Sequence, residues 1–421
     1  VNKIESLEAD IALNESSYLI DNQIINIFPK GVLLIHYIEN NFNLDFPIGF
    51  WNIYYRKPTT PFYISHLIGN NRSKILFKGY ISTSFINVYN YEKLLRKAYA
   101  FLNKTLETFQ SQLVNQLIKY DSTNDYRLLS FPNFLQQLCY LLLTFKRIFK
   151  KNYIWGVSYQ FVNEWKNFDF RKSILIKNPK GRWLADPFVW SYEGSHYCFV
   201  EDFSYKNQKA CISVFKINNS GYQEIGIALE ESFHLSYPFL FSSNDTLYMC
   251  PETSHAKDIR IYKCIDFPLV WKLHKVLLTD IIASDTSIFY QNNLWWLLTN
   301  KCTEEKGDNN SELHIYSTND LLYGEWEVHP MNPVIVDPLI ARNAGLIIES
   351  DSIFRSYQVQ GFNQYGYGVG VSKIINIDKE EYIEHKRLEI LSNSLKKIRG
   401  IHTFNYKDGL LVFDIEISDF I

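Results

Sequence analysis

The sequence lacks the features that mark several large classes of protein. Its six cysteines include no CxxC pair, which argues against a zinc knuckle and a disulfide framework and indicates reduced thiols in a cytoplasmic protein. The formal net charge is only −2, so the chain has no excess of basic residues, and we expect no nucleic-acid partner. The first ten residues hold no apolar core of a secretory signal.

The sequence also lacks an apolar run long enough to cross a bilayer. The most apolar stretch, Phe134 to Phe149, is too short and too interrupted. It ends in the basic residues Lys146, Arg147, Lys150 and Lys151, and a basic-tipped amphipathic helix could lie on a membrane surface. A helix packed on its own domain is the alternative. We therefore expect a cytoplasmic protein in which residues 134–151 would make any peripheral contact with a membrane.

Aromatic residues, in contrast, are abundant. The chain has 30 Phe, 29 Tyr and 9 Trp, a composition that suits β-sheets better than helical bundles. Residues 1–88 mix short β-branched runs with loops. Residues 89–152 show helical spacing, with Leu94, Ala98 and Phe101 at positions i, i+4 and i+7. Residues 170–421 consist of short aromatic and β-branched runs between turn residues, which is typical of an all-β region.

The all-β region repeats one pattern of two strands. The opening strands are LADPFVW, LSYPFLF, SDTSIFY, RNAGLII and HTFNY, and each is followed by a turn and a second apolar strand. Their anchor residues lie 50, 49, 57 and 60 positions apart and are Asp186, Ser236, Asp285, Arg342 and His402. Because a four-stranded propeller blade needs about 40 to 50 residues, the repeat predicts five blades.

The predicted fold is therefore mainly β. We expect a five-bladed β-propeller at residues 170–421, preceded by an N-terminal α/β remnant at 1–88 and a helical linker at 89–152. A pair of β-sandwiches is the alternative, but sandwiches would not produce one near-constant period. Cys198 and Cys250 occupy matching places in consecutive second strands, which indicates packing residues rather than metal ligands.

The repeat motifs resemble a known family. RWLADPF, FVEDF, HLSYPFLF, LYMCPETS, ASDTSIF and GEWEVHPMNPVI are similar to the propeller that forms the N-terminal domain of plant glucosamine inositolphosphorylceramide transferases. We expect the chain to be a bacterial relative of that domain over residues 175–421. The ADP motif at Ala185–Pro187 also resembles arabinan- and xylan-cleaving glycoside hydrolases, which are five-bladed propellers with three carboxylates around a central cavity.

The N-terminal region resembles part of a methionyl-tRNA-type formyltransferase domain. GVLLIHY, PIGFWNIYYRKPTTPFYISHLI and KILFKGY follow that family's order, and His36 stands at the place of its catalytic His. Asn71 replaces the family's Asp, and the half that supplies the catalytic Asn does not occur in this sequence. The resemblance therefore implies a truncated, inactive scaffold.

Polar residues open the predicted blades and end their second strands. Because the first strand of each blade lines the channel, we expect these residues to converge there. The candidate catalytic residues are Asp186, Asp285, Glu252 and Glu201. The candidate substrate-binding residues are Asp202, His234, Tyr237, Arg342, Asn343, Gln358 and His402. A ring of carboxylates with an Arg and a His could carry out glycoside chemistry.

The resemblance to the hydrolases implies roles for some of these residues. Asp186 matches the general base, and Asp285 matches the carboxylate that sets the pKa and orientation of the general acid. The hydrolases place that acid, a Glu, at the opening of blade four, where this chain has Arg342 and Asn343. An Arg cannot give up its proton at working pH, so Arg342 suits a phosphate or carboxylate on the ligand instead. The replacement acids to test are Glu252, Glu201 and Asp202.

Each candidate also has a purely structural interpretation. An Asp before Pro, or Asp285 before Thr286 and Ser287, could simply fix a turn. His402 could satisfy a hydrogen bond in the core. The hydrolase resemblance implies instead that His402 binds an ion or a water molecule. Ca²⁺ or a water molecule near His402 is therefore the one candidate for a bound cofactor. The aromatic residues that could stack on a sugar are Trp183, Tyr237 and Trp295.

Three functions are compatible with these residues. The first is an enzyme that synthesises or modifies a glycan or glycolipid, acting as a glycosyltransferase or a glycosidase. Its ligand would be a sugar, a nucleotide-sugar or a lipid-linked sugar, and this ligand could carry an acidic or phosphate group. The second is a non-catalytic glycan-binding module that supports a partner transferase. The third is an amino-sugar formyltransferase.

Overall fold

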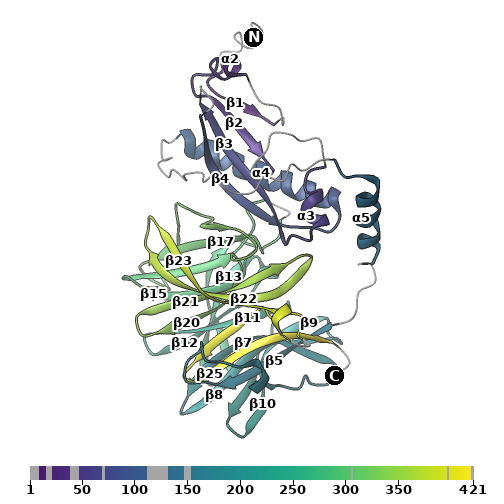
Figure 1. Cartoon of the computed structure of the whole chain (residues 1–421). Helices are drawn as coiled ribbons and strands as arrows, with labels where there is room; N and C mark the ends of the chain where they lie inside the picture. The colour runs from purple at the N-terminus through teal and green to yellow at the C-terminus, as the bar shows by residue number, and fades with distance from the viewer. Residues whose placement is uncertain are drawn as a thin grey trace. The chain divides into compact units, whose positions relative to one another are not determined.

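The computed structural model describes residues 9–15, 21–37, 47–68, 72–110, 131–146, 153–304, 307–395 and 398–418. The chain divides into two compact units. The first consists of residues 1–150 with 303–307, and the second of residues 151–302 with 308–421. Figure 1 shows the helices and strands of both units.

The first unit contains a small mixed sheet with the strand order β1-β2-β3-β4. Its strands are β1 (Ala12–Asn14), β2 (Val32–His36), β3 (Thr59–Ile68) and β4 (Arg72–Ser82). Strands β1 and β2 are parallel, whereas β3 is antiparallel to both β2 and β4. On β2, His36 Nε2 lies 2.6 Å from Ser65 Oγ on β3. The resemblance to a formyltransferase stays a prediction, and Asn71 lies outside the described residues.

The helices of the first unit are α2 (Asn22–Ile25), α3 (Phe50–Tyr54), α4 (Asn87–Gln110) and α5 (Phe134–Lys146). The helical spacing on α4 is confirmed, because Leu94, Ala98 and Phe101 are buried. On α5, Tyr140 packs against Phe50, whereas the side chains of Phe134, Leu135, Leu141, Leu142 and Phe145 are exposed. None of the described helices is both long enough and apolar enough to pass through a membrane. Contact of residues 134–151 with a membrane surface and a cytoplasmic location stay predictions; Arg147, Lys150 and Lys151 lie outside the described residues.

The second unit is built almost entirely from β-strands, which confirms the prediction of a mainly β chain. Its first sheet contains β7 (Arg182–Tyr192), β8 (Ser195–Ser204), β9 (Lys209–Asn218) and β10 (Gly221–Leu229). The second contains β11 (Ser236–Ser243), β12 (Thr246–Glu252), β13 (Asp258–Asp266) and β14 (Val270–Thr279). The third contains β15 (Ser284–Gln291), β16 (Leu294–Asn300), β17 (Glu312–Thr318), β18 (Glu327–Val328) and β19 (Ile335–Val336). The fourth contains β20 (Asn343–Glu349), β21 (Ser352–Gly361), β22 (Gln364–Ile377) and β23 (Tyr382–Leu391).

The fifth sheet joins two distant parts of the chain. It combines β24 (Phe404–Lys407) and β25 (Leu410–Ser418) with β5 (Tyr153–Phe161) and β6 (Ile174–Leu175). Strand β25 pairs antiparallel with β5 along its whole length, from Leu410 opposite Phe161 to Ser418 opposite Tyr153. Strand β5 lies before residue 170, where the sequence places the start of the β region. Three short 3₁₀ helices, η1 (Phe170–Lys172), η2 (Ser254–Ala256) and η3 (Ser392–Ser394), lie between strands.

The opening strands of the five sheets lie next to one another in chain order. Strand β7 contacts β11, β11 contacts β15, β15 contacts β20, and β20 contacts β24, which in turn contacts β7. Apolar side chains fill the space between neighbouring sheets. Phe188 on β7 and Phe239 on β11, for example, belong to one buried cluster with Ile288 on β15. The number of propeller blades stays a prediction.

A bulge recurs near the start of the first three opening strands. The strand register shifts by one residue between Ala185 and Phe188, between Ser236 and Phe239, and between Ser284 and Ser287. The residues inside these bulges have left-handed backbone angles, with φ of 47° at Asp186, 47° at Tyr237 and 50° at Asp285. Bulges redirect side chains and are common beside functional sites. The equivalent of Asp186 in the second sheet is therefore Tyr237, so the sequence alignment on Ser236 was wrong by one residue.

Candidate functional site

Asp186 lies in a buried group of charged residues formed by the first and fifth sheets. Its Oδ1 lies 3.0 Å from His402 Nε2 and accepts a 2.7 Å hydrogen bond from Thr403 Oγ1. Its Oδ2 accepts a hydrogen bond from the backbone N–H of Tyr237 at 3.1 Å. On the other side of the ring, His402 Nδ1 lies 3.1 Å from Asp414 Oδ2. The imidazole therefore lies between two carboxylates.

These contacts fix the charges in this group. Burial tends to raise the pKa of Asp186, but the charge of His402 and the hydrogen bonds from His402 and Thr403 outweigh it and lower the pKa below its ordinary value. Burial tends to lower the pKa of His402, but Asp414 and Asp186 hold it well above its ordinary value. The raised pKa favours the imidazolium form of His402, which lies between two carboxylates.

The same three residues could be considered as a cation site. Asp186, His402 and Asp414 each offer a ligand atom, and these atoms lie within 4.8 Å of one another. Ca²⁺ is bound by oxygen ligands, however, and both nitrogens of His402 face carboxylates at ion-pair distance. The positive charge is thus supplied by His402 itself, and the arrangement does not fit a resident Ca²⁺.

Asp285 lies in a second group, formed by the third and fourth sheets. Its Oδ2 accepts hydrogen bonds from Arg342 Nε at 2.6 Å and from Gln358 Nε2 at 3.0 Å. Arg342 Nη1 also donates to Asn310 Oδ1 at 2.6 Å. Burial raises the pKa of Asp285 to about 7; the charge of Arg342 opposes this rise, and the charges of Glu252 and Asp186 add to it. Two of the donor nitrogens of Arg342 are thus committed to neighbours within the protein.

Two of the predicted substrate-binding residues are part of the framework instead. Asn343 is fully buried, and its side-chain N–H groups donate to the backbone carbonyls of Asp285 at 2.7 Å and Leu298 at 3.1 Å. Tyr237 is also fully buried, and its hydroxyl lies 3.1 Å from Ser287 Oγ. The prediction that Tyr237 stacks on a sugar was wrong, because its ring is enclosed and packs against Phe188 at 4.7 Å between centroids.

Glu201 and His234 form a pair beside Asp186. His234 Nε2 lies 3.0 Å from Glu201 Oε1, and its Nδ1 accepts a hydrogen bond from the backbone N–H of Ala210 at 3.3 Å. Burial raises the pKa of Glu201 to about 7. The hydrogen bond from His234 and its charge oppose this rise, and the charge of Asp186 adds to it. The side chain of His234 is 29% exposed, so the pair can exchange protons with solvent.

The other two predicted acids lie in different environments. Glu252 on β12 and Glu201 on β8 occupy equivalent positions in their sheets. Each pairs with the residue just before the bulge of the opening strand, Glu252 with Ser236 and Glu201 with Ala185. Glu252 is partly exposed and accepts a hydrogen bond from Ser254 Oγ at 2.9 Å. Asp202, in contrast, is bound by Arg182 Nη1 and Ser213 Oγ, each at 2.6 Å. Asp202 is thus held by an ion pair of its own sheet, and the prediction that it binds substrate finds no support in these contacts.

The sequence did not indicate several residues that complete the two groups. Asp414 and Thr403 bind His402 and Asp186, and Trp155 on β5 packs against the His402 ring at 4.1 Å between centroids. Tyr365 lies 5.2 Å from His402 and 5.2 Å from the Arg342 guanidinium, and it is 38% exposed. Tyr365 therefore presents an accessible aromatic surface beside both groups. Asp414 could have been found as an acid within the apolar strand LLVFDIE.

The predicted stacking residues Trp183 and Trp295 lie elsewhere. Trp183 stacks on Phe203 with a centroid distance of 4.9 Å. Trp295 packs beside Tyr290 and Phe241 near the other end of the opening strands, at centroid distances of 5.3 and 6.0 Å. Neither residue contacts Asp186 or Asp285 in the interactions of the described residues.

Plant proteins share extended similarity with this chain. Glucosamine inositolphosphorylceramide transferase 1 of Oryza sativa subsp. japonica is 36% identical over 206 residues, which are 48% of this chain and 27% of the rice protein. The protein of the same name from Arabidopsis thaliana is 35% identical over 206 residues, which are 26% of its length. The chain thus spans about a quarter of the length of these relatives.

Solved structures with similar backbones include a thermostable family-43 glycoside hydrolase and the α-L-arabinofuranosidase from Lactobacillus brevis. The first is 18% identical and covers 56% of this chain and 88% of its own, with a TM-score of 0.42. The second is 15% identical and covers 58% and 87%, with a TM-score of 0.40.

The family model described as "Glucosamine inositolphosphorylceramide transferase 1, N-terminal" matches residues 173–411, which include all five opening strands. The match extends over more than half of the chain and contains Asp186, Glu201, Asp285, Arg342 and His402. The chain therefore belongs to this N-terminal family of glucosamine inositolphosphorylceramide transferase 1.

Proposed function

We propose that the second unit is a five-bladed β-propeller that binds a sugar at the two charged groups around Asp186 and Asp285. We further propose that the chain acts in the synthesis or modification of a glycan or glycolipid. Membership of a family named for a glucosamine inositolphosphorylceramide transferase supports a role with carbohydrates. The five sheets, each with its opening strand beside the next, support the propeller.

The observation that carries the proposal is the convergence of polar residues from distant parts of the sequence. The opening strands bring Asp186, Asp285 and His402 within range of one another's charges, since Asp186 contributes to the pKa shifts of both others. Tyr365 adds an exposed aromatic ring beside them. Aromatic surfaces flanked by a few fixed polar groups are typical of small-molecule sites.

The charges favour a neutral sugar or an amino sugar. In the described part of the chain, the carboxyl groups of Asp186, Asp285, Asp414, Glu201 and Glu252 lie near three basic groups, those of Arg342, His402 and the Glu201-bound His234, and the pKa is raised to about 7 for Asp285 and Glu201. Arg342 already binds Asp285 and Asn310. A phosphate or carboxylate on the ligand would therefore meet a surplus of negative charge, whereas an ammonium group would be attracted.

We propose binding, in support of a partner transferase, as the function that the geometry favours. Both aspartates that resemble hydrolase residues form ion pairs within the protein, Asp186 with His402 and Asp285 with Arg342. Arg342 also stands at the place of the hydrolases' general acid. An Asp with all its charge engaged in this way is poorly suited to activate water.

Titration calorimetry of the whole chain with glucosamine, N-acetylglucosamine, glucose and glucose 1-phosphate tests this proposal. We expect saturable binding of glucosamine or a neutral sugar and weaker binding of the phosphate. Tyr365→Ala should weaken binding about tenfold, the value of one stacking contact. The control is Tyr323→Ala, since Tyr323 is 85% exposed on the same unit and should have no effect. Tighter binding of glucose 1-phosphate, or no effect of Tyr365→Ala, contradicts the proposal.

A second candidate is glycosyl transfer or hydrolysis with Glu201 as the proton donor. The specific observation is that the pKa of Glu201 is raised to about 7, which suits a general acid near neutral pH. Turnover of nitrophenyl glycosides or of a nucleotide-sugar that is lost in Glu201→Gln, with sugar affinity unchanged, would support this candidate. Absence of turnover in the unmodified chain, with sugar binding retained, would leave binding as the function.

A further inference from the structure

A pocket lies among the same opening strands, further along each of them than the charged groups. It has a volume of about 190 Å³ and is lined by residues of all five sheets, among them Phe188 and Trp190 of β7 and Lys407 of β24. Phe188 to Trp190 follow Asp186 by two to four positions, and Asn405 to Lys407 follow His402 by three to five. Because a strand rises about 3.3 Å per residue, the pocket lies roughly 10 Å from the charged groups.

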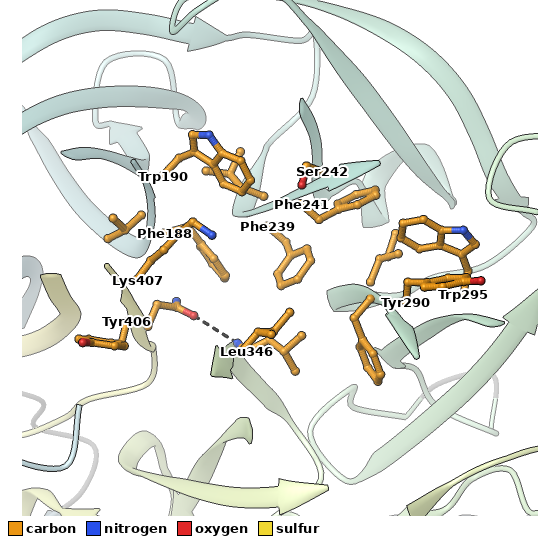
Figure 2. Close-up of a pocket in the computed structure, with 16 residues that line it drawn as sticks. Phe188, Trp190, Phe239, Phe241, Ser242, Tyr290, Trp295, Leu346, Tyr406 and Lys407 are labelled. Atoms are coloured by element: carbon orange, nitrogen blue, oxygen red, sulfur yellow. Dashed lines mark hydrogen bonds between the residues drawn. The ribbon is translucent and has the colours of Figure 1, made fainter. Parts of the chain in front are cut away.

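The lining of this pocket is aromatic, as Figure 2 shows. The rings of Phe188 and Phe239 form a floor, with their centroids 5.8 Å apart and both residues 4% exposed. Phe241 continues this row from Phe239 at 6.2 Å. At the mouth, Tyr290 is 54% exposed and packs against Trp295 at 5.3 Å. Such a lining suits an apolar chain that buries its length against rings.

One positive charge lies at the mouth of the pocket. Lys407 Nζ lies 4.4 Å from the centroid of the Trp190 ring, and none of the residues that line the pocket is acidic. In the described part of the chain, Lys407 also has no ion pair with a carboxylate. The charge of Lys407 is therefore available to a ligand, in contrast to that of Arg342.

Asn405 lines this pocket and is bonded to the backbone next to Asp186. Its Nδ2 donates to the backbone carbonyl of Pro187, the neighbour of Asp186, at 2.8 Å. Its Oδ1 accepts a hydrogen bond from the backbone N–H of Leu346 at 3.3 Å. Asn405 is buried and links the first, fourth and fifth sheets at the inner end of the pocket. The pocket is thus a site with its own lining, and its ligand need not be the sugar.

We propose that this pocket binds a small anionic amphiphile, with its alkyl chain on the Phe188–Phe239 floor and its anionic head beside Lys407. The volume equals that of about six water molecules, which limits the buried part to a short chain or to the end of a longer one. The apolar floor selects the chain, and the lone ammonium group selects a negative head. This inference does not depend on the proposed sugar site.

Titration of the whole chain with octyl phosphate, below its critical micelle concentration, tests this inference. Trp190 and Trp295 line the pocket, so binding should change the tryptophan fluorescence saturably. Octanol should bind several-fold more weakly than octyl phosphate, and octyltrimethylammonium more weakly still. Phenyl phosphate, which has the charge without the chain, should also bind more weakly.

Two pairs of variants assign the binding to this pocket. Lys407→Met should weaken octyl phosphate binding about fivefold, whereas Lys216→Met should not, because Lys216 lies over Tyr197 outside the pocket. Ile348→Glu places a negative charge at the mouth and should weaken binding further, whereas Ile375→Glu, at another exposed position of the same sheet, should not. Equal binding of octanol and octyl phosphate, equal effects within either pair, or no saturable binding would overturn the inference.

Discussion

Asp186 and Asp285 occupy the same place in equivalent strands but differ in their protonation. Each lies inside a bulge of an opening strand, with φ of 47° and 50°, and each is at most 5% exposed. Yet the pKa of Asp186 is lowered, whereas that of Asp285 is raised to about 7. The backbone therefore gives both carboxylates the same buried position in their strands, whereas their protonation differs.

Burial tends to raise the pKa of both carboxylates, so the difference arises from their neighbours: the charge of His402 lowers the pKa of Asp186, whereas at Asp285 the charges of Glu252 and Asp186 work against that of Arg342. The hydrogen bonds differ as well. Asp186 receives three, from His402, Thr403 and the backbone of Tyr237, which spread over both of its oxygens. The bonds identified for Asp285, from Arg342 and Gln358, both reach one oxygen, Oδ2. Hydrogen bonds to the charged form favour ionisation, and burial with few of them opposes it. A repeated backbone feature can thus place the same residue type in two electrostatic roles.

The largest expected effect separates the two aspartates by stability. Asp186→Asn removes one partner of the buried imidazolium, and we expect the free energy of unfolding to fall by about 3 kcal/mol. Asp285→Asn should cost about 1 kcal/mol, because Asp285 is partly protonated near neutral pH and Arg342 keeps its bond to Asn310. Urea unfolding followed by tryptophan fluorescence at pH 7 measures both.

The control for this pair is Asp266→Asn, an exposed acid of the same unit that should leave the unfolding midpoint unchanged. Equal losses in Asp186→Asn and Asp285→Asn, or a greater loss in Asp285→Asn, would show that the two groups are electrostatically alike.

A smaller effect tests how tightly the group around Asp186 is packed. Gly366 has φ of 61°, and a Cβ there would lie 2.9 Å from the Trp155 ring and 3.0 Å from His402 Cβ. We expect Gly366→Ala to lower the free energy of unfolding by about 2 kcal/mol, from backbone strain and from displacement of the His402 ring. Gly194→Ala isolates the strain, because Gly194 has φ of 70° with no atom within 4 Å of its Cβ position. If Gly366→Ala and Gly194→Ala lower the free energy of unfolding equally, the close contact of the new Cβ with His402 adds nothing to the cost of the backbone strain.

The smallest effect concerns pH. Asp285 and Glu201 both have their pKa raised to about 7, so between pH 5 and 8 the folded chain holds protons that the unfolded chain has already released. The free energy of unfolding should therefore fall as pH rises through this window. Glu201→Gln removes one of the two groups and should reduce the fall by about 1 kcal/mol, whereas exposed Glu380→Gln should not. If the free energy of unfolding instead rises from pH 5 to pH 8, the pKa values of Asp285 and Glu201 are not raised in the folded chain.

The repeat in the sequence was sufficient to predict the opening strands and most of the charged residues at their centre. Asp186, Asp285, Arg342 and His402 stand at the starts of similar segments, and a common strand geometry brings similar segments together. Glu201 and His234 were also predicted, but their contact was not, since it depends on how β8 lies beside the loop before β11.

The remaining features depend on contacts that have no pattern along the chain. Tyr365 reaches Arg342 and His402 from the start of β22, just after the turn that follows β21. The alignment on Ser236 failed because the bulge of β11 contains Tyr237, which shares no chemistry with the two aspartates. The hydrogen bond from Thr403, a residue 217 positions away, adds to the effect of His402 in lowering the pKa of Asp186.

The pairing of β5 with β25 has a consequence for the synthesis of the protein. Strand β5 leaves the ribosome about 250 residues before its partner, so its edge is exposed while the four intervening sheets are being made. Exposed strand edges can pair with other chains, and a growing polypeptide is most at risk while such an edge is open. The nascent chain would therefore depend on protection of β5 until translation reaches Ser418, and ribosomal stalling within β25 should trap an aggregation-prone intermediate.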